Sequence, residues 1–216
     1  MNILCVDPGI LAVGLFGGTV NGYGCITRIY HVSIVDVTKP FRKERASLHK
    51  YMCTFFDMYT TLFCQADVIV LERQPIASAG FPLELMFRER FGDKCKFVAP
   101  STLHKHYDLA AYTYEGRKAK CVSTVLNALQ IWVAGKLPGA ADAIRTIESM
   151  DRKHDCCDAC LIFMYYVTTT QFPNPPPTST ISFQTEVIRV ASHTDNSTMD
   201  TTDFKSFIEK FKYKKD

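Results

Sequence analysis

The sequence predicts a mixed α/β fold over residues 1–170, in which a five-stranded sheet is flanked by helices. Residues 3–37 contain three segments of strand character interrupted by glycines, which indicates hairpin-connected antiparallel strands. Helical spacing then alternates with short apolar runs, which indicates crossover helices and parallel strands. The chain has 216 residues, of which 47% are hydrophobic, so it can bury a core of ordinary size.

The first part of the chain is the predicted antiparallel meander. The apolar run from Ile3 to Val6 is closed by Asp7-Pro8-Gly9, a pattern typical of a buried strand that enters a tight turn. The next two strands are expected at 12–20 and 26–37, interrupted by Gly17-Gly18 and by Gly22-Tyr23-Gly24.

Helices and strands alternate over the rest of this domain. Apolar side chains at helical spacing predict a helix over 42–65, and Asp67-Val68-Ile69-Val70-Leu71 indicates a buried strand that ends at Glu72. Because a helical crossover leads to this strand, we expect it to lie parallel to the first strand and beside it. The further expected elements are a helix at 82–91, a strand at 95–99, a short helix from Ser101, helices at 117–137 and 145–150, and a last helix at 154–167.

The composition changes sharply near Thr168. The threonines at 168–170 are followed by Pro173-Asn174-Pro175-Pro176-Pro177, and prolines remove backbone donors while the polar residues bury nothing. We therefore expect a Pro/Thr-rich linker and a basic tail over 171–216. Within the tail, a short strand is expected at 181–191 and an amphipathic helix at 204–215, and a solvated tail is favoured over an arm that contacts nucleic acid.

Composition and charge exclude several classes of protein. No run of eighteen apolar residues is present, so no membrane-spanning helix is expected. Nine cysteines, an odd number, do not match a secreted disulfide framework, and the N-terminal residues lack signal-peptide and transit-peptide character. An intracellular, non-secreted protein is expected, with a mitochondrial location disfavoured. The net charge of +3 permits nucleic acid as a partner without requiring it.

Carboxylates occur at three points of the predicted fold where burial of a charge is energetically unfavourable. Asp7 ends the first strand, Glu72 ends the fourth, and Asp155 and Asp158 share one face of the last helix. The carboxyl ends of neighbouring parallel strands meet at one edge, which is where α/β sheets bind ligands. Clustered carboxylates repel one another, and a divalent cation such as Mg²⁺ or Mn²⁺ removes that cost. Two such ions would suit an in-line phosphoryl displacement.

Taken singly, these residues also have structural explanations. An Asp before Pro-Gly is commonly a turn former, Arg73 could pair with Glu72, and Asp155 could cap a helix. The cysteines 156, 157 and 160 lie beside His154, but no second cysteine pair stands at zinc-ribbon distance. These thiols are expected to behave as small buried apolar groups.

The segments that hold the acids have a pattern typical of one nuclease family. They read Ile3-Leu4-Cys5-Val6-Asp7-Pro8-Gly9, Val70-Leu71-Glu72-Arg73-Gln74 and Lys153-His154-Asp155-Cys156-Cys157-Asp158-Ala159, with Phe97-Val98-Ala99-Pro100-Ser101 between the last two. This combination resembles the RuvC-type Holliday junction resolvases of the RNase H-like superfamily, especially the poxvirus and mitochondrial branch. The resemblance covers about residues 1–170 and has no counterpart in the tail.

The resemblance implies a function and a site. It implies a homodimer that uses two Mg²⁺ ions per active site to cut paired strands of a four-way DNA junction. The implied catalytic metal ligands are Asp7, Glu72, Asp155 and Asp158, and the candidate DNA-binding residues are Arg73, Lys105, Arg117, Lys118, Lys120 and Lys153. It also suggests a large DNA virus, whose resolvase would act in the cytoplasm or nucleus of the infected host cell. No small-molecule cofactor is expected.

Other functions share parts of this pattern. An RNase H or an exonuclease would use the same carboxylates on a different nucleic acid, and the sequence does not separate these activities. A non-catalytic junction-binding protein is disfavoured because all four acids are present. An ATPase of the actin and sugar-kinase type would need a second domain that 216 residues do not hold. For the dimer contact, we consider Val125, Leu129, Trp132 and Val133 of the 117–137 helix, which could equally pack in the core.

Overall fold

A five-stranded mixed sheet forms the centre of the protein. The computed structural model describes residues 1–9, 12–41, 46–78 and 80–172. The strands, in the order β3-β2-β1-β4-β5, are β1 (Asn2–Pro8), β2 (Ala12–Val20), β3 (Ile26–Asp36), β4 (Val68–Glu72) and β5 (Cys95–Val98). β1, β2 and β3 pair antiparallel, whereas β1, β4 and β5 pair parallel. This topology confirms the predicted mixed sheet and the parallel pairing of the first and fourth strands.

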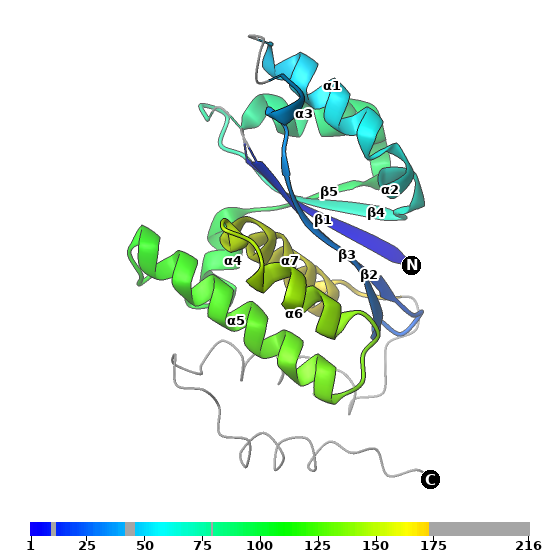
Figure 1. Cartoon of the computed structure of the whole chain (residues 1–216), viewed down its shortest axis with the longest axis vertical. Coiled ribbons are helices and arrows are strands. Elements are labelled where there is room, and N and C mark those ends of the chain that lie inside the picture. Colours follow the sequence, from blue (N-terminus) through cyan, green and yellow to red (C-terminus); the bar gives the residue numbers. More distant parts are fainter. Residues whose placement is uncertain (10–11, 42–45, 79, 173–216) are drawn as a thin grey trace.

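Helices cover both faces of the sheet (Figure 1). On one face lie α1 (Leu48–Met58), α2 (Thr60–Gln65) and α3 (Phe81–Phe91), and on the other lie α4 (Pro100–His106), α5 (Tyr114–Ala134), α6 (Ala140–Glu148) and α7 (Lys153–Thr169). Two short 3-10 helices, η1 (Lys39–Phe41) and η2 (Gly92–Lys94), complete the described elements. No helix among the described residues is long and apolar enough to cross a lipid bilayer.

Alternation along β1 divides the core into two apolar clusters. Leu4 and Val6 belong to a phenylalanine-rich cluster beneath α1, α2 and α3. Ile3 and Cys5 belong to the second cluster, which packs against α5, α6 and α7. Because successive side chains of a strand point to opposite faces, Asp7 continues the row of Ile3 and Cys5 and faces the layer that contains α5 and α7.

Local capping explains where several helices depart from the predicted bounds. The helix expected over 42–65 is two helices, and the first begins after Ser47, whose hydroxyl accepts a hydrogen bond from the Lys50 amide at 3.3 Å. α5 begins at Tyr114, earlier than expected, because the hydroxyl of Thr113 accepts a bond from the Gly116 amide in the same way. Residues 42–45 and the expected tail elements at 181–191 and 204–215 lie outside the described residues.

Candidate active site

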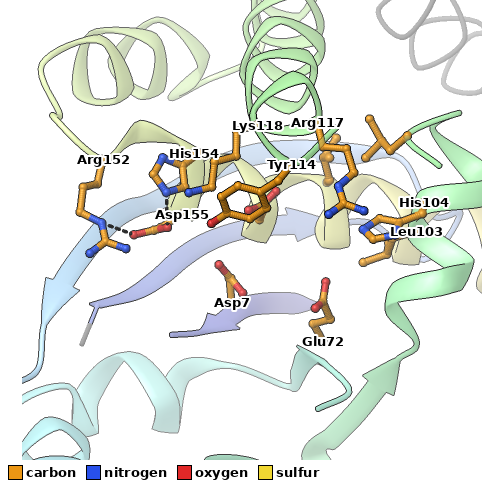
Figure 2. Close-up of a pocket in the computed structure, with 13 residues that line it drawn as sticks. Asp7, Glu72, Leu103, His104, Tyr114, Arg117, Lys118, Arg152, His154 and Asp155 are labelled. Atoms are coloured by element: carbon orange, nitrogen blue, oxygen red, sulfur yellow. Dashed lines mark ion pairs between the residues drawn. The ribbon is translucent and has the colours of Figure 1, made fainter. Parts of the chain in front are cut away.

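Asp7 and Glu72 lie at the same edge of the sheet because β1 and β4 are parallel neighbours. Val6 pairs with Leu71, so the two acids occupy the next position of the register on adjacent strands. Figure 2 shows both carboxylates directed toward the side chains of α5 and α7. The strand continues through Asp7 to Pro8, and within the described residues no hydrogen bond reaches the Asp7 carboxylate from a turn. The backbone carbonyl of Asp7 accepts a hydrogen bond from the Gly9 amide at 3.0 Å, so a tight turn does follow this residue, while its side chain lines the pocket.

α7 brings Asp155 and Asp158 to the same place. Asp155 is the third residue of the helix and Arg152 is its N-cap residue, so the suggestion that Asp155 caps the helix is wrong. Gly14, the cross-strand partner of Asp7 on β2, makes room for the first turns of α7. A Cβ atom on Gly14 would lie 2.0 Å from the backbone carbonyl oxygen of Asp155. The helix can approach the sheet this closely only because position 14 has no side chain.

One pocket of about 260 Å³ collects the four acids. Besides Asp7, Glu72, Asp155 and Asp158, its lining consists of Leu103, His104, Leu109, Tyr114, Arg117, Lys118, Arg152, His154 and Leu161. The acids come from three segments that are far apart in the sequence, whereas Tyr114, Arg117 and Lys118 come from one face of α5 (Figure 2). The pocket therefore combines an acidic floor, formed by the four acids, with a basic and aromatic wall, formed by Tyr114, Arg117 and Lys118.

The carboxylate of Asp155 contacts two basic side chains. Arg152 Nε lies 3.0 Å from Asp155 Oδ2, and His154 Nε2 lies 2.9 Å from Asp155 Oδ1 (Figure 2). The contact with Arg152 lacks hydrogen-bond geometry, so Oδ2 is a buried oxygen without a hydrogen bond among the described residues. The carboxylate of Asp155 is therefore already paired with side chains of the protein itself.

Asp158 has a different partner. The thiol of Cys121, on α5, donates a hydrogen bond to Asp158 Oδ1 with an Sγ–Oδ1 distance of 2.9 Å. This neutral donor leaves the charge of the carboxylate in place.

Burial is the first cause of raised pKa values in the acidic floor. It raises the pKa of Asp7 well above its usual range, and the negative charges of Asp158, Glu72 and Asp155 act in the same direction, against Arg152. Burial, followed by the charge of Asp158, raises the pKa of Glu72 to about 7. The pKa of Asp158 is also raised by burial, although the bond from Cys121 and the charge of His154 oppose the shift. Without a cation, the floor therefore retains protons near neutral pH.

In EDTA, the free energy of unfolding should fall as the pH rises from about 4.5 to about 7. The pKa of Glu72 moves from 4.5 in the unfolded chain to about 7 in the fold, so the folded state binds more protons in this window. The shift corresponds to about 1–3 kcal/mol for this mostly buried group. Urea unfolding across the pH range would measure it, and Glu72→Gln should flatten the slope. An unchanged slope in that variant would contradict the assignment.

The donor set of the pocket fits a hard divalent cation. As the side chains stand, no group of three or more described His, Cys, Asp or Glu residues is arranged to hold a metal ion, and Asp155 is engaged with Arg152 and His154 instead. The chemistry is nevertheless that of a magnesium or manganese site, because all four acids are hard oxygen donors. Oδ2 of Asp155 is, in addition, a buried oxygen without a hydrogen bond among the described residues. Binding would require Asp155 to exchange its present partners.

The structure separates the six predicted DNA-binding residues into two groups. Arg117 and Lys118 line the acidic pocket. The other four, Arg73, Lys105, Lys120 and Lys153, are not among the residues that line it. The guanidinium of Arg73 lies 5.9 Å from the centroid of the Phe97 ring. Only α5 therefore carries predicted basic residues into the pocket itself.

Tyr114 and Arg152 are among the lining residues of the pocket that sequence reasoning missed. Tyr114 is 58% exposed and its ring centroid lies 4.2 Å from Lys118 Nζ. Its spacing of three and four residues from Arg117 and Lys118 is a signal that could have placed it on the same helix face. Arg152 carries no such signal, because its contact with Asp155 depends on the conformation of the N-terminal turn of α7.

Another missed residue supports the chain just after Glu72. Glu84, on α3, is buried and accepts a hydrogen bond from the Gln74 amide at 2.8 Å, while Arg88 pairs with its other oxygen at 3.2 Å. The predicted pairing of Glu72 with Arg73 is absent from the ion pairs of the described residues. Glu84 thus connects the segment that follows Glu72 to helix α3, on the face of the sheet opposite α5 and α7.

Comparison with known proteins gives a fold match without a sequence match. No family model and no curated protein sequence matches this chain. The fowlpox virus Holliday junction resolvase superposes with a TM-score of 0.54 and 16% identity, covering 79% of this chain and 100% of that one. The fowlpox virus resolvase in its complex with substrate Holliday junction DNA gives 0.50 and 17%, covering 77% and 99%. Thermus thermophilus RuvC gives 0.46 and 14%, covering 77% and 95%. The protein therefore has the RNase H-like fold, in the form seen in the fowlpox virus resolvase.

Proposed function

We propose that this protein is a Mg²⁺-dependent endonuclease that resolves four-way DNA junctions by paired phosphodiester hydrolysis. One observation carries the proposal: acids from β1, β4 and α7 line a single pocket whose wall is formed by Arg117 and Lys118. The fold similarity to the fowlpox virus resolvase supports the choice of a branched DNA substrate. A role in the recombination or concatemer processing of a viral genome is part of the same proposal.

Each part of the pocket has a proposed task. Asp7, Glu72, Asp155 and Asp158 would hold two Mg²⁺ ions, for which Mn²⁺ can substitute. Bound by these acids, such ions would supply activation of the attacking water and stabilisation of the charge on the leaving oxygen. Arg117 and Lys118 bind the phosphates beside the scissile bond, which positions the strand over the acids without reading its sequence. Arg73, Lys105, Lys120 and Lys153 remain candidates for more distant backbone contacts.

We include a homodimer in the proposal, because paired incisions on opposed strands require two sites related by a two-fold axis. The contact considered on α5 is not supported. Val125, Leu129 and Trp132 are buried in the core cluster between the sheet and α5, α6 and α7, and only Val133 is exposed. A dimer contact would therefore use residues other than these three.

A cleavage assay on three substrates tests this function. A labelled four-way junction, a linear duplex and an RNA–DNA hybrid would each be incubated with the protein in Mg²⁺ and in EDTA. We expect symmetric nicks in the junction in Mg²⁺ alone. Preferred cleavage of the hybrid would support an RNase H instead, and junction binding without cleavage would support a non-catalytic binding protein.

We propose that the nuclease unit spans residues 1–170 and extends by two residues to Phe172. Phe172 is partly buried against the core and its ring occupies the space beside Gly24. A chain that ends at Phe172 should therefore fold and cleave junctions at a rate within about twofold of the full chain. Thermal melting and junction cleavage of both chains would measure this. Loss of folding in the shorter chain would mean that residues 173–216 contribute to the domain.

A further inference from the structure

The buried thiol of Cys121 contacts the carboxylate of Asp158. Cys121 lies within α5 and is 1% exposed, and its Sγ lies 2.9 Å from Asp158 Oδ1. Elsewhere in the described chain, no hydrogen bond to the carboxylate of Asp7 or Glu72 is made, and Asp155 pairs with Arg152 and His154. Cys121 is thus a neutral donor dedicated to one member of the acidic floor.

Whether the partner of a carboxylate is charged or neutral determines how strongly that carboxylate can still attract a cation. Arg152 places a positive charge against Asp155 and His154 occupies its other oxygen, so both must be displaced before Asp155 can bind a cation. A thiol donates one weak hydrogen bond and carries no formal charge. It restricts the orientation of Asp158 while leaving the negative charge and the second oxygen, Oδ2, for another partner. Because the S–H group is buried against the helix layer, it has no water to bond instead.

The position of Cys121 on α5 links this contact to the basic wall. Residues three and four apart on a helix share a face, so Cys121 follows Arg117 and Lys118 on the side that faces the pocket. One rigid helix thus carries both the groups proposed to bind phosphate and the donor that holds Asp158. The distance between the proposed phosphate contacts and the donor to Asp158 is therefore set within a single element.

We propose that Cys121 is a positioning residue that orients Asp158 for binding a divalent cation. This inference rests on the proposed role of Asp158 as a metal ligand. Donors behind a ligand restrict its orientation, and their removal weakens metal binding by roughly 10–100-fold. For a single thiol we expect the lower end of that range, about tenfold.

The test compares cation binding by three variants of the full chain. Cys121→Ala removes the donor, Cys121→Ser keeps a donor of similar size, and Cys160→Ala removes an equally buried thiol of α7 for which no contact with the acids is found. Mn²⁺ titration by calorimetry would give the dissociation constant, and urea unfolding would give the stability. We expect Cys121→Ala to weaken Mn²⁺ binding about tenfold, Cys121→Ser to restore most of it, and Cys160→Ala to lose stability alone.

Two further measurements separate the possible failures. If Asp158→Asn loses Mn²⁺ binding but Cys121→Ala binds like the wild type, the positioning role is wrong and the proposed site stands. If Asp158→Asn binds Mn²⁺ and cleaves junctions normally, the proposed site itself is wrong. Infrared spectra of the wild type report the hydrogen bond directly, even if Cys121→Ala does not fold. A hydrogen-bonded S–H band that moves in Asp158→Asn supports the inference, and a band that does not move overturns it.

Discussion

Asp7→Asn should lower the single-turnover rate of junction cleavage by about a thousandfold and leave junction affinity unchanged or higher. The amide keeps the shape of the side chain but removes a charge that would hold a cation. It also removes a negative charge that repels the DNA phosphates, which is why binding should not weaken. Among the four acids, Asp7 should be the most sensitive, because its pKa is raised by the charges of all three others. Asp7 is therefore close enough to interact electrostatically with each of the other three acids.

Stability distinguishes this explanation from a structural role. Removing one charge from a self-repelling cluster should leave the free energy of unfolding unchanged or higher in EDTA, whereas loss of a turn or cap would cost about 1 kcal/mol. Glu72→Gln, Asp155→Asn and Asp158→Asn should follow the same pattern. Asp57→Asn, at an exposed surface pair with Arg90, is the matched control and should cleave normally. Amide variants that unfold early yet still cleave in Mg²⁺ would refute the metal-site assignment.

Gly14→Ala should impair both folding and cleavage. The added Cβ atom would lie 2.0 Å from the carbonyl oxygen of Asp155, so either the first turns of α7 or strand β2 must move. Overpacking of this kind costs about 1–3 kcal/mol. Cleavage should fall by about a hundredfold or more, because the shift displaces Asp155 and Asp158 from the acids of the sheet.

The control for this change is Gly135→Ala at the end of α5. There a Cβ atom would lie 3.5 Å from the nearest backbone oxygens, which is ordinary contact, and the backbone φ of −73° suits any residue. Urea unfolding and junction cleavage of the two variants would be compared directly. Wild-type cleavage by Gly14→Ala would mean that α7 tolerates displacement, and the account of this close approach would then be wrong.

Local patterns were sufficient to predict the sheet and the acids. Apolar runs that end in an acid defined β1 and β4, and the helical crossover between them made the strands parallel, which brought Asp7 and Glu72 to one edge. The pairing of Asp155 with Arg152 was not predictable because it depends on the conformation of the first turn of α7, and the pairing of Asp158 with Cys121 was not predictable because it depends on how α7 lies against α5. Likewise, the apolar face of α5 has the same spacing whether it packs in a core or in a dimer. Only the tertiary structure assigns Val125, Leu129 and Trp132 to the core.

Because side chains alternate between the two faces of β1, the position of Asp7 in the pocket depends on the register with which β1 pairs with its neighbours. Ile3, Cys5 and Asp7 share one face, and Leu4 and Val6 share the other. A slip of one residue between β1 and its neighbours would still offer apolar side chains to both layers, because residues 3–6 of β1 are all apolar. It would, however, turn Asp7 toward the phenylalanine-rich layer and present Val6 to the pocket. An insertion of one residue between positions 3 and 6 that leaves the pairing of the preceding residues unchanged would therefore yield a chain that can still collapse around its core but lacks Asp7 in the pocket.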